Sequence, residues 1–375
     1  VIKIERSYAR GLREPVGDPI GGWIGKDPGK EPWNRNAAFV KLARNSRSVC
    51  VDLKHKKGRE IFLELVGHAD VVIENFSAST MSNLNLDYET LVEANPNIIY
   101  LTMPGFGKTG PYKDWVAFGP IIEPMSGLTA AMGYSLEEPR NSGVALVDPT
   151  SATSAAAAIV TAIRSRKKKV GGSTQIEMSL HEAGVSFNGP WLIDSQLGAP
   201  SPVLNNGHPN MCPHGVYPCK GEDEWLALAC EDQKDWETLA KIDHSLDPSW
   251  TIKERQECSD SINLSIAVWC ETRTKESAAE QLQKMGIAAG PVNTVPDMFK
   301  DPHVEERKFF VPFERAETPM PGNPIKMEGI DSSDWTRCPD LGEHNFELLE
   351  DWLGYTPDEL NQFLEEGVIA DRPPS

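Results

Sequence analysis

The chain has 375 residues and a formal net charge of −18, because 37 Lys and Arg residues stand against 55 Asp and Glu residues. This charge argues against nucleic acid or an anionic membrane as the main partner, and we find no apolar run long enough to cross a bilayer. The length predicts two or more domains. The seven scattered cysteines predict a reduced, intracellular compartment. We expect the cytoplasm, with the mitochondrion and the peroxisome left open.

The first half of the chain alternates predicted strands and helices. Residues 1–6 read as a strand that is already under way, as though the chain began in the middle of a fold. Apolar spacing then predicts strand 49–53, helix 59–68, strand 70–76, helix 88–93 and strand 98–103. The strand at 70–76 is mostly apolar, as a strand covered on both faces should be. This β-α-β-α-β order predicts a parallel sheet with right-handed crossovers.

The second half changes character near Gly198. Before that point we expect an alanine-rich helix at 151–164, a solvated basic turn at 164–169, strand 175–178 and helix 180–193. After it, a linker-like stretch (199–202 and 205–207) leads to segments 217–219, 225–229 and 262–284, which suggest a smaller α+β domain. A Pro-rich irregular region follows at 301–338, and two short helices are predicted at 345–353 and 357–364.

Asp148 is a lone carboxylate between an apolar segment, 144–147, and the small-residue helix. Asp is a favoured N-cap and Pro a favoured first helical residue, so Asp148-Pro149 is an ordinary helix start. A carboxylate in this place can also act as a nucleophile. No histidine lies between His68 and His181, so proton chemistry close in sequence to Asp148 must do without imidazole.

Other motifs point to less specific structures. The turn 105–110 ends in Gly107-Lys108-Thr109, but Thr102 stands where a phosphate-binding P-loop needs glycine, so we interpret it as a glycine-rich turn. There is no Gly-x-Ser-x-Gly nucleophile elbow. Four possible metal ligands lie close together in the sequence, but their spacing matches no paired ligand motif, so a hydrogen-bonded loop is favoured over a metal site. They are His208, Cys212, His214 and Cys219.

Taken in order, several segments resemble the family III CoA-transferases, also called the carnitine dehydratase and bile-acid-inducible protein family. The match covers nearly the whole chain and keeps the family order. The matching segments are 1–6, 44–54, 69–76, 86–88, 95–96, 104–107, 126–128, the Asp148 segment, 341–344 and 366–369.

The resemblance implies an α/β fold with a large Rossmann-like domain whose chain crosses into a small domain and returns. We therefore expect a large CoA-binding domain at 1–198, a small α+β domain at 199–320, and a return segment with C-terminal helices at 321–375 that packs on the large domain. It also implies a homodimer of two interlocked subunits.

The resemblance further implies the site residues. It matches Asp148 to the family's nucleophilic aspartate, and the substrates it implies are an acyl-CoA and a carboxylic acid acceptor. Arg6, Arg47 and Lys54 are expected to bind the CoA phosphates. No metal and no permanently bound cofactor are expected. The other positions expected to line the CoA site are Val51, Asp52, Leu53, Asn75, Phe76, Ser77, Ala117, Phe118, Gly119 and Pro120.

The chemistry implied is transfer of CoA through a covalent aspartyl intermediate. Backbone N–H groups at the helix start beside Asp148 would stabilise the oxyanions. The sequence departs from the family in three places. Members begin with about thirty more residues, a first strand and helix; Asn83 stands where some relatives carry a phosphate-facing arginine; and the glycine-rich loop of formyl-CoA transferases is not evident at 206–214, so formyl or oxalyl substrates are not indicated.

Three other interpretations compete with this one. A 2-methylacyl-CoA racemase needs a His upstream of its Asp, and the stretch 111–128 holds none. A catalytically impaired CoA-binding protein is the alternative that the short N-terminus suggests. A lyase or hydrolase on the same fold is a further alternative.

Overall fold

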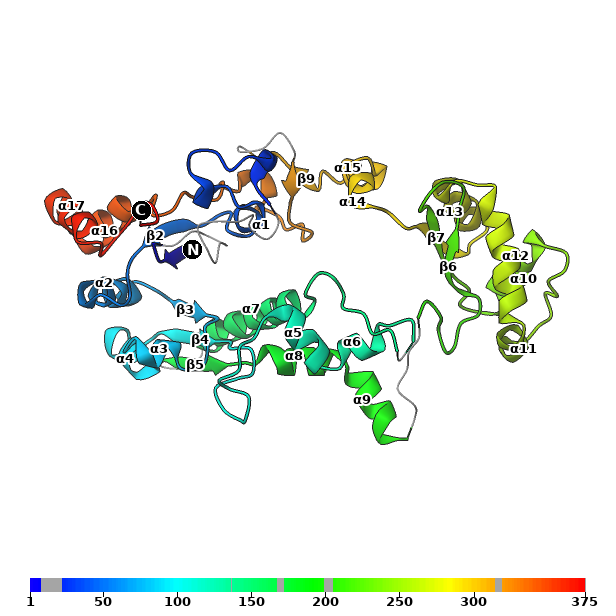
Figure 1. The fold of residues 1–375 in the computed structure, drawn as a ribbon, viewed down its shortest axis with the longest axis horizontal. Coiled ribbons are helices and arrows are strands. Elements are labelled where there is room, and N and C mark those ends of the chain that lie inside the picture. The colour runs from blue at the N-terminus through cyan, green and yellow to red at the C-terminus, as the bar shows by residue number, and fades with distance from the viewer. Residues whose placement is uncertain (8–21, 136, 167–171, 199–204, 314–318, 375) are drawn as a thin grey trace. The chain divides into compact units, whose positions relative to one another are not determined.

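The computed structural model describes residues 1–7, 22–135, 137–166, 172–198, 205–313 and 319–374 (Figure 1). These residues fold into two compact units. Unit 1 consists of Val1–Val116, Thr153–Ser179 and Lys300–Ser375, and unit 2 of Ala117–Ala152 and Leu180–Phe299. Among the described helices, none has the length and apolar character needed to span a bilayer.

Unit 1 is built on parallel strands, as the sequence predicts. One sheet pairs β1 with β2, and a second has the order β3-β4-β5. The prediction placed the strands at 49–53, 70–76 and 98–103 in one sheet, and this was wrong, because β2 pairs with β1 whereas β3 pairs with β4 in a second sheet. Ile73 of β3 is 57% exposed, so the expectation that this strand is covered on both faces was wrong. The strands are β1 (Ile2–Glu5), β2 (Arg47–Cys50), β3 (Val71–Glu74), β4 (Ile99–Thr102) and β5 (Thr174–Glu177).

The helix α2 (Lys56–Gly67) joins two hydrophobic cores of unit 1 because it is apolar on two faces. Ile61 and Leu65 pack with Leu348 and Leu360 of α16 (Asn345–Leu353) and α17 (Pro357–Glu365). Phe62 and Val66 instead pack with a cluster that includes Leu91 and Tyr100. The remaining helices and strands are α1 (Ala37–Leu42), α3 (Thr80–Asn83), α4 (Tyr88–Ala94), α15 (Pro302–Glu306) and the antiparallel pair β9 (Phe310–Val311) and β10 (Met320–Pro321).

Unit 2 begins with a helical part. It holds α5 (Gly119–Met125), α6 (Leu128–Ala131), the start of α7 (Val147–Arg166), α8 (Leu180–Phe187) and α9 (Gly189–Gln196). One continuous helix over 180–193 was predicted, and this was wrong. The helix is interrupted at Asn188, whose side-chain amide donates to the Ser126 carbonyl, and Pro190 lies in the first turn of the next helix.

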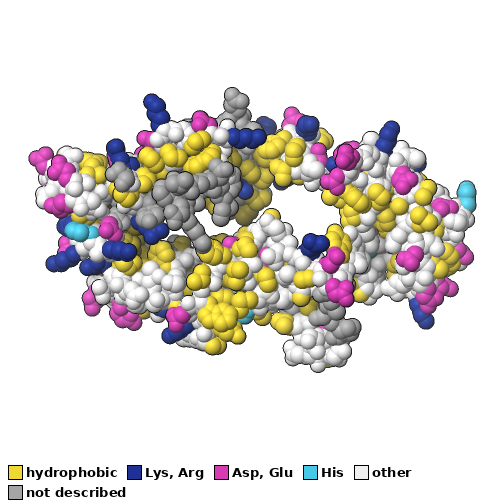
Figure 2. Space-filling view, in the orientation of Figure 1, with side chains coloured by type: hydrophobic (Ala, Val, Ile, Leu, Met, Phe, Trp, Pro, Cys, Tyr) yellow, Lys and Arg dark blue, Asp and Glu magenta, His cyan; other side chains and the backbone are white. Residues whose placement is uncertain are grey.

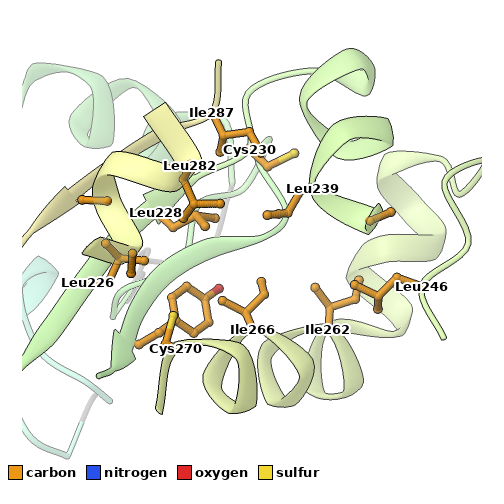
Figure 3. Close-up of a cluster of buried hydrophobic side chains, with 14 of the residues drawn as sticks. Leu226, Leu228, Cys230, Leu239, Leu246, Ile262, Ile266, Cys270, Leu282 and Ile287 are labelled. Atoms are coloured by element: carbon orange, nitrogen blue, oxygen red, sulfur yellow. The ribbon is translucent and has the colours of Figure 1, made fainter. Parts of the chain in front are cut away.

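The second part of unit 2 is an antiparallel sheet covered by helices. Its strands are in the order β6-β7-β8, and Figure 3 shows Leu226, Leu228, Ile262 and Leu282 meeting in one buried cluster. The stretch 262–284 forms two helices because Thr274 caps the second one. The elements are β6 (His214–Pro218), β7 (Trp225–Ala229), α10 (Gln233–Leu239), α11 (Ile252–Glu257), α12 (Ser259–Glu271), α13 (Lys275–Lys284), β8 (Ala288–Pro291) and α14 (Val295–Met298).

Two expectations fall on segments outside the described residues. These are the linker at 199–202 and the basic run at 167–169. Arg166, just before that run, pairs with Asp70. The proposed domain boundaries at 198/199 and 320/321 stay a prediction.

Candidate functional site

Asp148 lies inside the first turn of α7, not at its N-cap. The helix begins at Val147, and the Asp148 N–H donates to the Ala145 carbonyl at 2.9 Å. Within the described part of the chain, the Asp148 carboxylate accepts no hydrogen bond and pairs with no cation. A capping side chain would accept a bond from the backbone of the next turn. The helix-cap interpretation is therefore not supported by the hydrogen bonds of this turn.

The carboxylate lies against Gly119 at the start of α5. A Cβ atom added at Gly119 would come within 2.7 Å of Asp148 Oδ2 and within 2.7 Å of the Ala145 side chain. Real Cβ atoms do not approach other atoms so closely, and Gly119 is itself buried. The side chain of Asp148 can therefore take this position only because residue 119 is a glycine.

The surroundings of Asp148 disfavour its charged form. Desolvation of the carboxyl group, and then the negative charge of Glu123, raise the pKa of Asp148 above its ordinary value. Glu123 is only 1% exposed. Its carboxylate accepts bonds from the Ser142 N–H, the Ser142 hydroxyl at 2.8 Å and the Leu146 N–H at 3.1 Å. Glu123, whose carboxylate is buried and hydrogen-bonded, thus lies near Asp148, whose carboxylate accepts no hydrogen bond from the described residues.

The N–H groups at the start of α7 are mostly engaged. Those of Leu146, Asp148 and Thr150 donate to Glu123, Ala145 and Leu146 respectively, and Pro149 has none. An oxyanion needs donors that are not already bonded. The predicted role of this helix start in oxyanion stabilisation therefore finds little support in these bonds.

In unit 1, two predicted CoA-site segments meet at the carboxyl edge of the β1–β2 sheet. Glu5 is paired with Cys50, and the Val51 N–H donates to the Glu5 carbonyl at 2.8 Å. Arg6 and the turn 51–54 therefore follow neighbouring parallel strands at the same end. In α/β proteins, ligands bind at the carboxyl ends of parallel strands. Arg6 and Lys54 are exposed there.

The turn after β2 packs closely on the first turn of α2. A Cβ atom at Gly58 would lie 2.0 Å from the Asp52 carbonyl oxygen, so only glycine fits. Arg59 donates to the Lys54 carbonyl at 2.8 Å, and the Asp52 side chain accepts from the Lys54 N–H at 2.9 Å. Figure 2 shows Lys, Arg and His side chains gathered over α2. This turn presents backbone and positive charge together.

The segment 75–77 follows the carboxyl end of β3, as the turn 51–54 follows that of β2. The Asn75 side-chain amide donates to the Met103 carbonyl, and the Phe76 N–H donates to the buried carboxylate of Glu74 at 2.7 Å. The Ser77 hydroxyl lies 2.7 Å from that of Thr80. These contacts fix a turn at the carboxyl end of a parallel strand, with Phe76 itself 48% exposed.

Comparison with known proteins now decides the family. A family model described as CoA-transferase family III matches residues 1–345. The chain belongs to CoA-transferase family III. It is an enzyme of that class, and the predicted α/β fold with parallel sheets is confirmed.

Relatives of this family III CoA-transferase support the assignment. It is 30% identical over 342 residues to the succinyl-CoA–D-citramalate CoA-transferase of Chloroflexus aurantiacus, which covers 88% of this chain and 83% of that protein. It is 31% identical over 337 residues to the succinate–glutarate CoA-transferase of Agrobacterium fabrum, which covers 84% and 81%. A CAIB/BAIF family protein from Brucella suis has a TM-score of 0.79 at 27% identity, covering 94% of this chain and 91% of that one.

The predicted CoA residues of this family III CoA-transferase fall into separate groups. Arg6, 51–54 and 75–77 belong to unit 1, whereas Asp148 and 117–120 belong to unit 2. Arg47 is not brought together with Lys54. It begins β2 at the opposite end from the turn, where its guanidinium pairs with Glu347 at 2.7 Å.

Three residues that shape these sites were not predicted from the sequence. Glu123, Gly58 and Arg59 act through contacts with other elements. Gly58 could have been noticed, because glycine is unfavourable inside a helix and its presence in a first turn needs a reason. Glu123 could have been noticed as the lone acid in the apolar stretch 117–128.

The other motifs take no part in a described site. Gly107 adopts φ +81°, and the Lys108 N–H donates to Glu177, so the segment forms a bonded turn. Cys212 and Cys219 are buried, and desolvation raises the pKa of both thiols. Among the described residues, no group of three or more His, Cys, Asp and Glu side chains is placed to hold a metal ion.

Proposed function

We propose that this enzyme moves CoA from succinyl-CoA to a short dicarboxylic acid, with Asp148 as the covalent nucleophile. The observation that carries the proposal is the Asp148 carboxylate, which lies against Gly119 without a hydrogen-bond partner among the described residues. Asp148 is exposed, so a substrate can reach it, and partial desolvation of its carboxyl group raises its pKa. The names of the relatives, which combine succinyl-CoA or succinate with citramalate or glutarate, support the substrate class.

The transfer proceeds in four balanced steps. An Asp148 oxygen attacks the thioester carbonyl, the C–S bond breaks, and CoA leaves as a thiolate from a mixed anhydride. The thiolate then attacks the aspartyl carbonyl, which releases succinate and forms an Asp148–CoA thioester. A carboxylate oxygen of the acceptor attacks that thioester and again expels the CoA thiolate. Attack of the thiolate on the acceptor's acyl carbonyl gives the new CoA ester and restores the Asp148 carboxylate.

The remaining predicted residues bind CoA in this proposal. Arg6 and Lys54 bind phosphate groups at the carboxyl edge of the β1–β2 sheet, where the backbone of the turn 51–54 also contacts the ligand. The segments 75–77 and 117–120 line the rest of the ligand. The positive charge of this edge offsets the overall charge of −18.

The proposal includes a homodimer, which the family resemblance suggests. Large apolar side chains that are exposed in the single chain favour a partner surface. Leu42 and Leu197 are each 80% exposed. Light scattering on the purified protein should give twice the chain mass; a monomer that transfers CoA would contradict this part of the proposal.

Mass spectrometry after mixing with succinyl-CoA tests the mechanism. We expect a CoA-sized adduct on the peptide that contains Asp148, and no adduct on Asp148→Ala. Asp194→Ala is the matched control, because Asp194 is an exposed acid on α9 of the same unit. We expect this control to form the adduct and to transfer CoA normally.

Two results would contradict the proposal. Normal CoA exchange by a folded Asp148→Ala variant would exclude Asp148 as the nucleophile. Exchange of the α-proton of a 2-methylacyl-CoA with solvent, without any adduct, would instead support the racemase alternative. CoA binding with neither reaction would support a protein that only binds CoA.

A further inference from the structure

Glu123 is a buried carboxylate that the proposed mechanism does not use. It lies on α5 and is 1% exposed. No Lys or Arg pairs with it in the described part of the chain. A buried charge without a counter-ion is costly unless hydrogen bonds compensate for the lost water. Here the hydrogen bonds come from Ser142 and Leu146, in the segment that leads into Asp148. The position of Glu123 therefore connects it to Asp148.

The bonds of Glu123 hold both ends of a short strained segment. Ser142 donates its N–H and its hydroxyl, and Leu146 donates its N–H. Between them Ala145 adopts φ +48°, in the left-handed region that a residue with a Cβ avoids. The Ala145 carbonyl then accepts the Asp148 N–H. Glu123 is therefore connected through two hydrogen bonds and one strained residue to the backbone of Asp148.

We propose that Glu123 is a positioning residue for Asp148: its carboxylate fixes segment 142–146, so that the Asp148 side chain points past Gly119 toward the reacting carbonyl. This inference rests on the proposed function of Asp148. Glu123 contacts neither the substrate nor the transferred group in this account. It acts by geometry and by its charge.

The charge contribution can be separated from the geometry. Desolvation and then the charge of Glu123 raise the pKa of Asp148, and a more basic carboxylate is a stronger nucleophile. The helix α8, which lies against Val147, also carries His181 and Glu182, and Arg140 precedes Ser142 by two residues. Among the described residues, Glu123 is the charged group that shifts the Asp148 pKa.

Two substitutions separate the two contributions. Glu123→Gln keeps the size but removes the charge and replaces one acceptor with an NH₂ group. Glu123→Asp keeps the charge but shortens the reach to Ser142 and Leu146. We expect each to lower kcat by about ten- to a hundredfold, because a displaced nucleophile reacts much more slowly. The KM for succinyl-CoA should change by less than about threefold, since no ligand contact is lost.

The pH profile adds a readout that a purely structural role would not move. The acidic limb of kcat/KM reports ionisation of the nucleophile in the free enzyme. We expect Glu123→Gln to move this limb to lower pH, and Glu123→Asp to leave it close to that of the wild type. Glu138→Gln is the matched control, because Glu138 is an exposed acid of the same unit that pairs with Arg140. This control should change neither kcat nor the pH profile.

A smaller substitution protects the test against misfolding. Ser142→Ala removes one of the three donors, and we expect kcat to fall by about two- to fivefold with an unchanged melting temperature. Wild-type kcat and pH profile in folded Glu123→Gln would overturn the inference, as would wild-type kcat in Ser142→Ala if Glu123→Gln does not fold. Adduct formation by Asp148→Ala would instead overturn the proposed function, so the two failures are distinguishable.

Discussion

The first turn of α7 and the core of the β6–β8 sheet differ in how well their side chains are paired. Around Asp148, a carboxylate without hydrogen bonds lies against a glycine, and the preceding Ala145 is strained. The Trp236 side chain, in contrast, has a partner for its polar group and for its ring. The Trp236 side chain is fully buried, its indole N–H donates to the Asp247 carbonyl at 3.0 Å, and its ring stacks on that of Trp250.

We expect this difference between residues that stabilise the fold and residues that we propose to perform chemistry. Complementary contacts lower the free energy of the folded state, whereas a reactive group must keep its polar atoms free to contact the substrate. We therefore expect substitutions at Trp236 to change stability and substitutions near Asp148 to change activity.

Trp236→Ala should have the largest effect on stability. Removal of a fully buried aromatic side chain leaves a cavity, and the Asp247 carbonyl and the guanidinium of Arg255 lose a partner. We expect the free energy of unfolding to fall by about 3–5 kcal/mol in urea titration. Leu264→Ala on α12, where the side chain is 66% exposed, is the control and should change it by less than about 0.5 kcal/mol. Equal effects of both would contradict the assignment of this core.

Gly119→Ala should mainly affect the reaction rate. The new Cβ would lie 2.7 Å from Asp148 Oδ2, so the carboxylate must move. We expect kcat to fall by about ten- to a hundredfold in a CoA-transfer assay. Gly189→Ala is the matched control in the same unit, since nothing lies within 4 Å of its added Cβ. A Gly119→Ala enzyme with wild-type kcat would show that this contact does not position the nucleophile.

Gly58→Ala should weaken CoA binding. The added Cβ would meet the Asp52 carbonyl at 2.0 Å and push the turn 51–54 away from α2. We expect the Kd for CoA, measured by calorimetry, to rise by about tenfold, which is about 1.4 kcal/mol. Gly67→Ala at the other end of the same helix meets its nearest atom at 3.9 Å and serves as the control. Unchanged CoA affinity in both variants would place the CoA site elsewhere.

Asp148→Asn should abolish transfer yet raise the melting temperature slightly at neutral pH. Because the pKa of Asp148 is raised in the folded chain, the folded state binds this proton more tightly than the unfolded state does. The wild type keeps that contribution below an ordinary Asp pKa of about 4 and loses it as the pH rises through the folded value. The difference between the two melting temperatures should therefore shrink from pH 7 to pH 4. A difference independent of pH would contradict the raised pKa.

Local patterns predicted much of the secondary structure correctly. The apolar spacing of 59–68 and 88–93 predicted α2 and α4, and 345–353 matches α16. These helices have strong one-sided patterns, so their own residues determine them. The interruption at Asn188 was missed although Gly189-Pro190 is a local signal for it; the bond from Asn188 to Ser126, 62 residues away in the chain, could not be predicted from local pattern.

The sequence by itself determined the family, the alternation of strands and helices, and the choice of Asp148 as the candidate nucleophile. Each of these depends on residue type and order alone. Only the tertiary structure decided what surrounds Asp148. It brought Gly119 and Glu123 to the carboxylate and placed Asp148 within the helix instead of at its cap. Such neighbours come from a different helix, and local propensities carry no information about contacts between distant segments.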